Sequence, residues 1–202
     1  KFKPYNARVQ WRGSGIFFRL SKTWKEVDNE IVIGLVQSLL IRVKKERMKP
    51  TFNIELYTSF VRRLPDATPK GESDFGLEQA FNILNQKYFD NMLEQPTIVW
   101  GNGSTTKLAH YDLHTDKIVM SSIFKDAPVH LLEYVMYHEM LHKKHRFVAR
   151  GNRSHFHTTA FKEDENKFEN ADAVEKELGR FASGRKRAGR RMSLFSRFFR
   201  PF

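Results

Sequence analysis

The sequence contains no cysteine among its 202 residues. This absence excludes disulfide bonds, a thiolate nucleophile and a zinc site built from cysteines. The chain also lacks a run of about eighteen apolar residues, the length that predicts a membrane-spanning helix. No secretory signal-peptide pattern is visible, so we expect an intracellular protein, cytoplasmic or, in a eukaryote, nuclear.

Acidic residues are scarce relative to basic ones. Asp and Glu together number 23 against 35 Lys and Arg, which gives a formal net charge of +12. Such a surface attracts polyanions, above all the phosphate backbone of nucleic acids. Hydrophobic residues make up 40% of the chain and include 18 Phe, so the core can support one domain with an accessory layer.

The positive charge concentrates at the C-terminal end, residues 181–202, where arginine alternates with phenylalanine and no acidic residue occurs. Arginine pairs with phosphate and phenylalanine can stack on unpaired bases, so this composition favours DNA binding. The candidate nucleic-acid-binding residues are Arg185, Lys186, Arg187, Arg190 and Arg191. The same pattern would suit an anionic membrane or a partner's groove, with anchors at Phe195, Phe198, Phe199 and Phe202. Its Arg, Gly and Ser content predicts a mobile tail.

The most informative motif is His138-Glu139-Met140-Leu141-His142. On a helix, residues four apart lie on one face, so the two imidazoles can bind a single zinc ion. Glu139 would then lie beside the water that the metal holds, as a general base.

The residues before the motif predict the helix that it needs. Asp126 can cap the helix and Pro128 can occupy its first turn. The charged pair Lys143 and Lys144 indicates that this helix reaches solvent directly after His142.

A catalytic zinc ion usually has three protein ligands, so a third must come from elsewhere. The short metzincin spacing would place it at Val148, which cannot bind a metal, and His145 is too close along the helix. Four residues of a following helical segment remain open as ligands: His155, His157, Glu165 and Glu169.

Several ordered features together resemble the SprT-like metalloproteases, the family that includes Spartan. Fourteen residues separate His142 from His157, and His157 is followed by Phe161 in the family's His-x-x-x-Phe pattern. Upstream, the segment from Phe81 to Asp90 resembles the family's opening helix. The segments 96–100, 108–112 and 117–121 resemble its strands. The resemblance covers roughly residues 75–180.

This resemblance implies an α+β, zincin-like metalloprotease domain with one catalytic Zn²⁺. The ligands would be His138, His142 and His157, with Glu139 as the catalytic base. The implied substrates are proteins crosslinked to DNA, and the implied partner is single-stranded or damaged DNA. Three alternatives remain: a general zinc protease with no link to nucleic acid, a nucleic-acid-binding module with a degenerate metal site, and a membrane-associated protease that binds anionic lipid through the segment from Phe195 to Phe202.

The sequence pattern divides the chain into an accessory unit, a protease domain and the basic tail of residues 181–202. Residues 1–66 form an accessory unit with strands from Ala7 to Trp11 and from Ile16 to Leu20, and helices through 28–43 and 54–64. A linker at 65–73 leads to the protease domain, residues 67–180, with a helix from Leu77 to Leu93, a small antiparallel sheet, the motif helix and a second ligand helix. We expect two of these helices, the first and the second ligand helix, to bury the following positions: Leu77, Phe81, Leu84, Tyr88, Met92, Phe161, Phe168 and Leu178.

Overall fold

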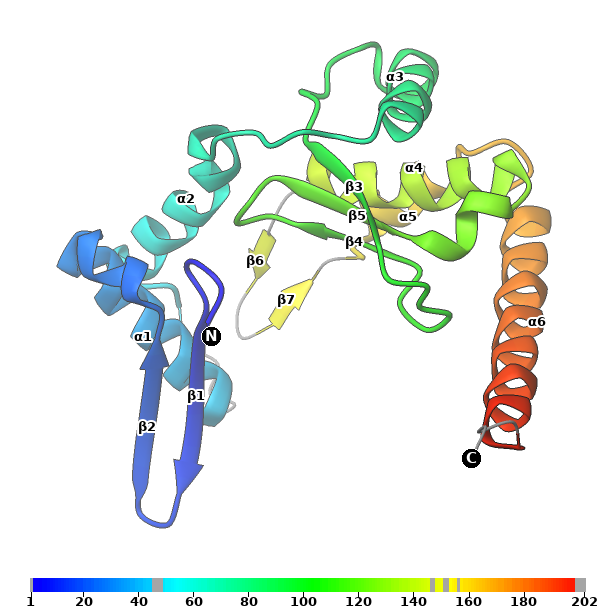
Figure 1. Ribbon diagram of the computed structural model, residues 1–202. Coiled ribbons are helices and arrows are strands. Elements are labelled where there is room, and N and C mark those ends of the chain that lie inside the picture. The colour runs from blue at the N-terminus through cyan, green and yellow to red at the C-terminus, as the bar shows by residue number, and fades with distance from the viewer. Residues whose placement is uncertain (1, 45–48, 146–147, 151–152, 156, 199–202) are drawn as a thin grey trace. The chain divides into compact units, whose positions relative to one another are not determined.

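The computed structural model describes residues 2–44, 49–145, 148–150, 153–155 and 157–198 (Figure 1). In this part of the chain no helix is long and apolar enough to cross a membrane. The chain folds into two compact units, described separately below. The first comprises Lys1–Pro69, Leu113–Asp116 and His145–Thr158; the second comprises Lys70–Asp112, Lys117–Lys144 and Thr159–Phe202.

The first unit opens with an antiparallel hairpin of β1 (Ala7–Arg12) and β2 (Gly15–Leu20), as predicted. A 3-10 turn (Lys22–Glu26), α1 (Asn29–Lys44) and α2 (Phe52–Ala67) follow. Asp28 caps α1, because its carboxylate accepts from the Glu30 N–H at 2.8 Å. Two short paired strands, β6 (Val148–Arg150) and β7 (Arg153–His155), also belong to this unit.

The core of the first unit is small and aromatic. Trp24, Leu35 and Leu39 are buried, and the rings of Tyr5 and Trp24 meet edge to face with centroids 5.5 Å apart. Partly buried residues of the hairpin and α2 pack around them, so the hairpin and helices share one core. The accessory unit is therefore a folded layer with its own interior.

Gly34 allows α1 and α2 to approach closely. A Cβ placed on Gly34 would collide with the Asn53 backbone carbonyl, which cannot move independently of α2. We therefore expect Gly34→Ala to destabilise the protein by about 3 kcal/mol or more. Gly179→Ala is the matched control, because a Cβ there meets nothing within 4 Å and alanine favours a helix. Thermal or urea unfolding of both variants measures the difference, and equal stabilities would contradict the close packing of α1 on α2.

The segment 65–73, expected as a linker, is ordered by helix and strand contacts. Helix α2 continues through Pro65 to Ala67. Further on, the Gly71 N–H donates to Thr97 Oγ1 and the Ile98 N–H donates to Ser73 Oγ, both at 2.8 Å. The division between the two units falls within this segment, after Pro69, and the two hydrogen bonds attach its second half to the start of a strand in the second unit.

The second unit begins with α3 (Phe75–Phe89), capped by Asp74, whose side chain accepts from the Leu77 N–H. The helix ends four residues earlier than we expected, because Asp90 and Asn91 adopt left-handed conformations with φ of 52° and 58°. The buried Asn85 side chain then bonds both backbone groups of Leu93 and closes this turn. Met92 consequently lies outside the core with 82% of its surface exposed, so its expected burial is wrong.

Three strands form the central sheet, in the order β3 (Thr97–Gly101), β5 (Lys117–Ser121), β4 (Ala109–Asp112). The predicted hairpin of β4 and β5 is antiparallel, but β3 runs parallel to β5. The sheet is thus mixed, and our expectation of an antiparallel sheet is wrong. The parallel arrangement arises because the chain from β3 crosses to the far edge before returning through β5 in the middle.

Helix α4 (Val129–His145) carries the motif and packs on this sheet (Figure 1). It begins directly after Pro128, whose carbonyl accepts from the Leu131 N–H at 3.0 Å. Asp126, our expected cap, instead ends the preceding 3-10 turn (Ser122–Asp126). Leu131, Met136, Met140 and Leu141 of α4, together with Ile98, Ile118 and Met120 of the sheet, are at most 1% exposed. The motif therefore lies on a helix fixed by a close-packed core.

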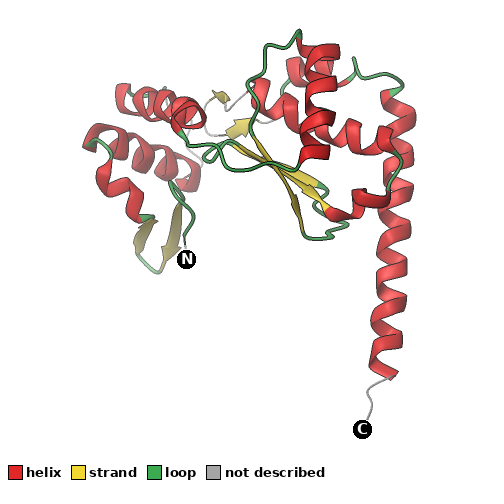
Figure 2. Ribbon diagram, turned by 45° about the horizontal axis from the view of Figure 1, so that its top comes forward, coloured by secondary structure: helices red, strands yellow, loops and turns green. Residues whose placement is uncertain are grey.

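Two helices follow the motif: the short α5 (Thr159–Glu165) and the long α6 (Ala171–Phe198). Phe161 and Phe168 are buried and Leu178 is partly buried against the same core, as expected. Figure 2 shows α6 extending well beyond the sheet and helices of its own unit. The segment expected as a mobile tail from residue 181 is helical as far as Phe198, and Phe199 and Phe202 lie outside the described residues.

Candidate metal centre

Helix α4 places His138 and His142 one above the other, both partly buried. Their rings meet edge to face with centroids 4.8 Å apart, and their Nε2 atoms are separated by 3.2 Å. Two nitrogens bound to one tetrahedral zinc ion at 2.0–2.1 Å would lie about 3.3 Å apart. The pair therefore has the spacing that a single metal ion requires.

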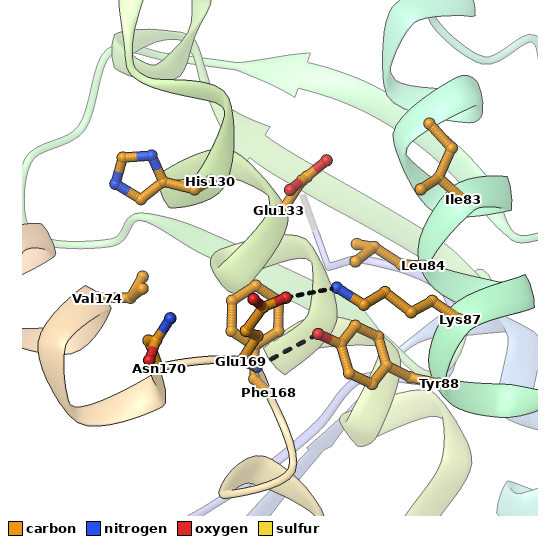
Figure 3. Close-up of a pocket in the computed structure, with 10 residues that line it drawn as sticks. All are labelled: Ile83, Leu84, Lys87, Tyr88, His130, Glu133, Phe168, Glu169, Asn170 and Val174. Atoms are coloured by element: carbon orange, nitrogen blue, oxygen red, sulfur yellow. Dashed lines mark hydrogen bonds and ion pairs between the residues drawn. The ribbon is translucent and has the colours of Figure 1, made fainter.

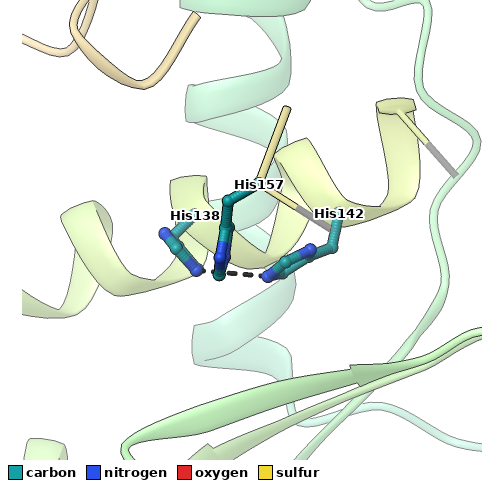
Figure 4. Close-up of side chains that lie close together, drawn as sticks. All are labelled: His138, His142 and His157. Carbon is teal, nitrogen blue, oxygen red and sulfur yellow. Dashed lines mark hydrogen bonds between the residues drawn. The ribbon is translucent and has the colours of Figure 1, made fainter. Parts of the chain in front are cut away.

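His157 completes a group of three imidazoles (Figure 4). One ring nitrogen from each of His138, His142 and His157 lies within 4.8 Å of the others. His157 is exposed and lies in a bend two residues before α5 begins, not on the second helix where we expected a ligand. A ligand on irregular backbone can approach the two fixed rings of α4 from a direction that a continuing helix would not allow.

Phe161 forms an apolar wall beside the metal ligands. Its side chain is fully buried, and its ring centroid lies 5.2 Å from that of His138 and 4.9 Å from that of His142. Packing against both imidazoles limits their rotation, so Phe161 holds the two nitrogens in their orientation. This contact gives a physical reason for a phenylalanine four residues after His157.

Three polar contacts attach α5 to the motif helix. The Tyr137 hydroxyl donates to the Asp164 carbonyl at 2.6 Å, and Lys144 Nζ donates to the Asp164 carboxylate at 2.7 Å. Burial raises the pKa of Tyr137 well above its usual value, so this hydroxyl stays protonated and remains a donor. The third contact joins His138 to Glu165 and bears on the metal directly.

Lys143 and Lys144 behave differently from each other. Lys143 is only 4% exposed, with its ammonium 5.9 Å from the Tyr111 ring centroid, whereas the side chain of Lys144 is 41% exposed. Our expectation that α4 reaches solvent directly after His142 is therefore wrong at Lys143. The cause is the sheet beside it, because β4 covers that face of the helix and buries the lysine stem.

Glu165 contacts His138 and can fix the orientation of its ring. Its Oε1 lies 2.6 Å from His138 Nδ1. A neutral ring that donates from Nδ1 to this carboxylate leaves the Nε2 lone pair free to face a metal. Glu165, one of the alternative third ligands, thus supports a ligand, a role that the sequence alone did not reveal.

We expect Glu165→Ala to weaken zinc affinity about 10- to 100-fold, because without this carboxylate the His138 ring is free to rotate away from the metal. Glu165→Gln can still accept the Nδ1 proton and should lose less. Glu163→Ala, on an exposed position of the same helix, is the matched control. Competition with a chromophoric zinc chelator measures the three affinities; equal values for Glu165→Ala and Glu163→Ala would contradict the orienting role.

Glu139 lies between the two histidines on α4 and is 6% exposed. Burial raises the pKa of its carboxyl above the usual value, and three neighbours oppose that rise: the His138 ring, the Tyr111 backbone N–H and Lys107. The Tyr111 N–H donates to the carboxylate from β4, an edge strand of the sheet. Glu139 is thus a buried acid held in place by backbone beside the proposed metal ligands.

Glu169, another alternative ligand, lies at a different place in the second unit. It pairs with Lys87 at 2.9 Å and lines a cavity of about 470 Å³ with Tyr88, His130 and Glu133 (Figure 3). His130, judged structural from the sequence, lies 3.0 Å from Glu177. Neither residue belongs to the group of three histidines. His155 lies in β7, and its side chain is not among those that the structure describes.

The predicted DNA-binding residues occupy α6. Lys186 and Arg187 are exposed, and the Arg185 guanidinium lies 5.4 Å above the Phe181 ring. Arg190 and Arg191 belong to the same helix, but their side chains lie outside the described part of the chain. A regular helix therefore spaces the described cations, rather than the flexible tail that composition predicted.

No model of a known protein family, no curated protein and no solved structure matches this chain.

Proposed function

We propose that this protein is a zinc-dependent endopeptidase of the SprT-like type. The observation that carries the proposal is the group of His138, His142 and His157, with one ring nitrogen from each within 4.8 Å of the others. Three imidazoles are a common ligand set for catalytic zinc, which leaves a fourth position for water or substrate. The buried Glu139, between the first two ligands in sequence, supplies the acid–base group that hydrolysis needs.

The residues divide the chemistry between them. A zinc ion in this site supplies Lewis-acid activation of water and of a carbonyl group. Glu139 accepts a proton from the attacking water and returns it to the amine that leaves. The Tyr111 N–H holds the Glu139 carboxylate, and Glu165 orients His138. The buried Phe161 excludes water from one side of the ligands.

The strand β4 lies at one edge of the sheet, beside the candidate base. Among the described strands it pairs only with β5, and its Tyr111 N–H binds the Glu139 carboxylate. A peptide substrate that lies extended along the edge of the sheet would gain main-chain hydrogen bonds, which carry little sequence preference. Such binding suits a protease that acts on many different proteins.

The basic helix α6 supports a link to nucleic acid. After Glu177 the sequence has no acidic residue, while Lys186 and Arg187 project into solvent. Phosphate contacts from this helix would hold the enzyme on DNA and bring DNA-bound proteins to the metal centre. We therefore propose DNA-associated or DNA-crosslinked proteins as the substrates.

One assay tests both parts of the proposal. Cleavage of casein and of histone is measured with and without single-stranded DNA, alongside metal analysis of the same sample. We expect one zinc ion per chain and cleavage that DNA stimulates. Cleavage that DNA does not stimulate would indicate a general zinc protease. DNA binding without zinc or cleavage would indicate a binding module with a degenerate metal site.

A further inference from the structure

The β1–β2 hairpin of the first unit carries positive charge without an acidic counterpart. From Lys1 to Lys25 the sequence has seven Lys and Arg residues and no Asp or Glu. Among the residues that the structure describes, no ion pair involves Arg8, Arg12 or Arg19, and all three are exposed. Ion pairing within the described residues therefore does not explain why these three positions carry arginine.

The pairing register places all three arginines on one face of the hairpin. Arg8 lies opposite Arg19, Gln10 opposite Phe17, and Arg12 opposite Gly15. Directly opposed residues of a hairpin share a face, and the alternate pairs face the other way. That other face supplies Ala7, Val9, Phe18 and Leu20 to the unit's own core. The arginine face therefore points outward.

The opposition of Arg8 and Arg19 is unfavourable for the isolated protein. Like charges directly across two strands destabilise a hairpin. A polyanion lying over this face would relieve the repulsion and use both charges at once. The hairpin thus gives up some stability for an arrangement that an anionic ligand favours.

Phe17 adds an aromatic surface among the arginines. Its side chain is 56% exposed, and a Cβ added to Gly15 would lie 3.1 Å from its ring. The ring therefore lies over Gly15, the residue opposite Arg12, where the missing side chain leaves room for it. Arginine beside an exposed ring is the combination that binds phosphate and stacks on an unpaired base.

We propose that the outward face of the β1–β2 hairpin binds single-stranded nucleic acid. Arg8 and Arg12 lie about 14 Å apart along one strand and, with Arg19, contact the phosphates. Phe17 stacks on a base, which a duplex would not offer because its bases are already stacked on each other. This surface is made by residues 7–20 alone and stands whether or not the metal site is catalytic.

The test measures binding of a fluorescent 20-nucleotide strand to the full-length chain by anisotropy across a salt series. One variant replaces Arg8, Arg12 and Arg19 with Gln. The matched control replaces Arg42, Lys49 and Arg63, exposed cations elsewhere in the same unit, and removes the same charge. We expect the hairpin variant to bind at least about tenfold more weakly, with a salt slope lower by about 2. The control should change little.

Two further single variants distinguish the contribution of base stacking from that of charge, and a true loss of binding from a loss caused by misfolding. Phe17→Ala should weaken binding about tenfold with an unchanged salt slope. Arg19→Glu creates an ion pair with Arg8, so it should raise the melting temperature while it weakens binding. A variant that is more stable and binds less cannot owe its loss to unfolding.

Four results would overturn the proposal: equal losses from the hairpin and control triple variants, unchanged binding by Phe17→Ala, tighter binding to duplex than to single strands, or a preference for phosphatidylserine vesicles over the oligonucleotide. DNA and RNA strands of the same sequence are compared in parallel. Their relative affinities identify which single strand the hairpin prefers.

Discussion

Replacing Glu139 with Gln is expected to reduce peptide cleavage about 100- to 10,000-fold, the usual contribution of a general base. The amide occupies nearly the same volume and can still accept from the Tyr111 N–H, so the buried position should tolerate it. It cannot accept a proton from water at neutral pH. Zinc content should stay unchanged, because the three imidazoles remain. Cleavage of a labelled protein and metal analysis of the same preparation measure both effects.

Glu133→Gln provides the matched control for this prediction. Glu133 lies on the same helix but lines the separate cavity with Tyr88 and His130 (Figure 3). Its replacement should leave cleavage close to that of the parent protein. Full activity of Glu139→Gln would refute the role of Glu139 as the base. Equal losses of activity in both variants would show that removing any acidic charge from α4 impairs the protein.

Replacing His157 with Ala is expected to remove most of the bound zinc and nearly all activity. Loss of an orienting partner alone costs 10- to 100-fold in metal affinity, so loss of a direct ligand should cost at least about 100-fold. The fold should survive, because the His157 side chain is exposed and α5 is held by Tyr137 and Lys144 through Asp164. Zinc titration with circular dichroism measures affinity and folding together.

Two further histidines test whether the third ligand is assigned correctly. His145 ends α4 and lies outside the group of three, whereas His155 lies in β7 and its side chain is outside the described part of the chain. Alanine at either position should leave zinc bound. Loss of zinc from His155→Ala with retention in His157→Ala would reverse the assignment.

The sequence predicts best where one local rule decides the outcome. The approach of His138 to His142 depends only on their lying four residues apart on a helix. The apolar residues that α4 buries stabilise that helix. The hairpin at Gly13 and the helix capped by Asp28 also follow from local turn and capping chemistry. The α+β class follows from the same elements.

The sequence predicts less where distant residues decide. Glu165 has the composition of a surface acid, and only the position of α5 on α4 brings it to His138. Lys143 is buried because β4 covers it, which no periodicity within α4 could reveal. The parallel pairing of β3 with β5 likewise depends on the path of the whole sheet.

The helix-ending conformation of Asp90 illustrates a third kind of limit. A left-handed aspartate can end a helix, yet aspartate is also common within loops and at helix starts, so the residue type alone does not fix the boundary. The apolar pattern therefore extended the expected helix to Leu93. In the structure the chain turns at Asp90, and Met92 is left exposed.

Zinc K-edge X-ray absorption on the purified, zinc-loaded protein counts the imidazole rings bound to the metal. We expect nitrogen and oxygen ligands at about 2.0–2.1 Å, with outer-shell scattering from three imidazole rings that falls to two in His157→Ala. A sample that takes up no zinc, or a spectrum whose imidazole count is the same in both proteins, would contradict this expectation.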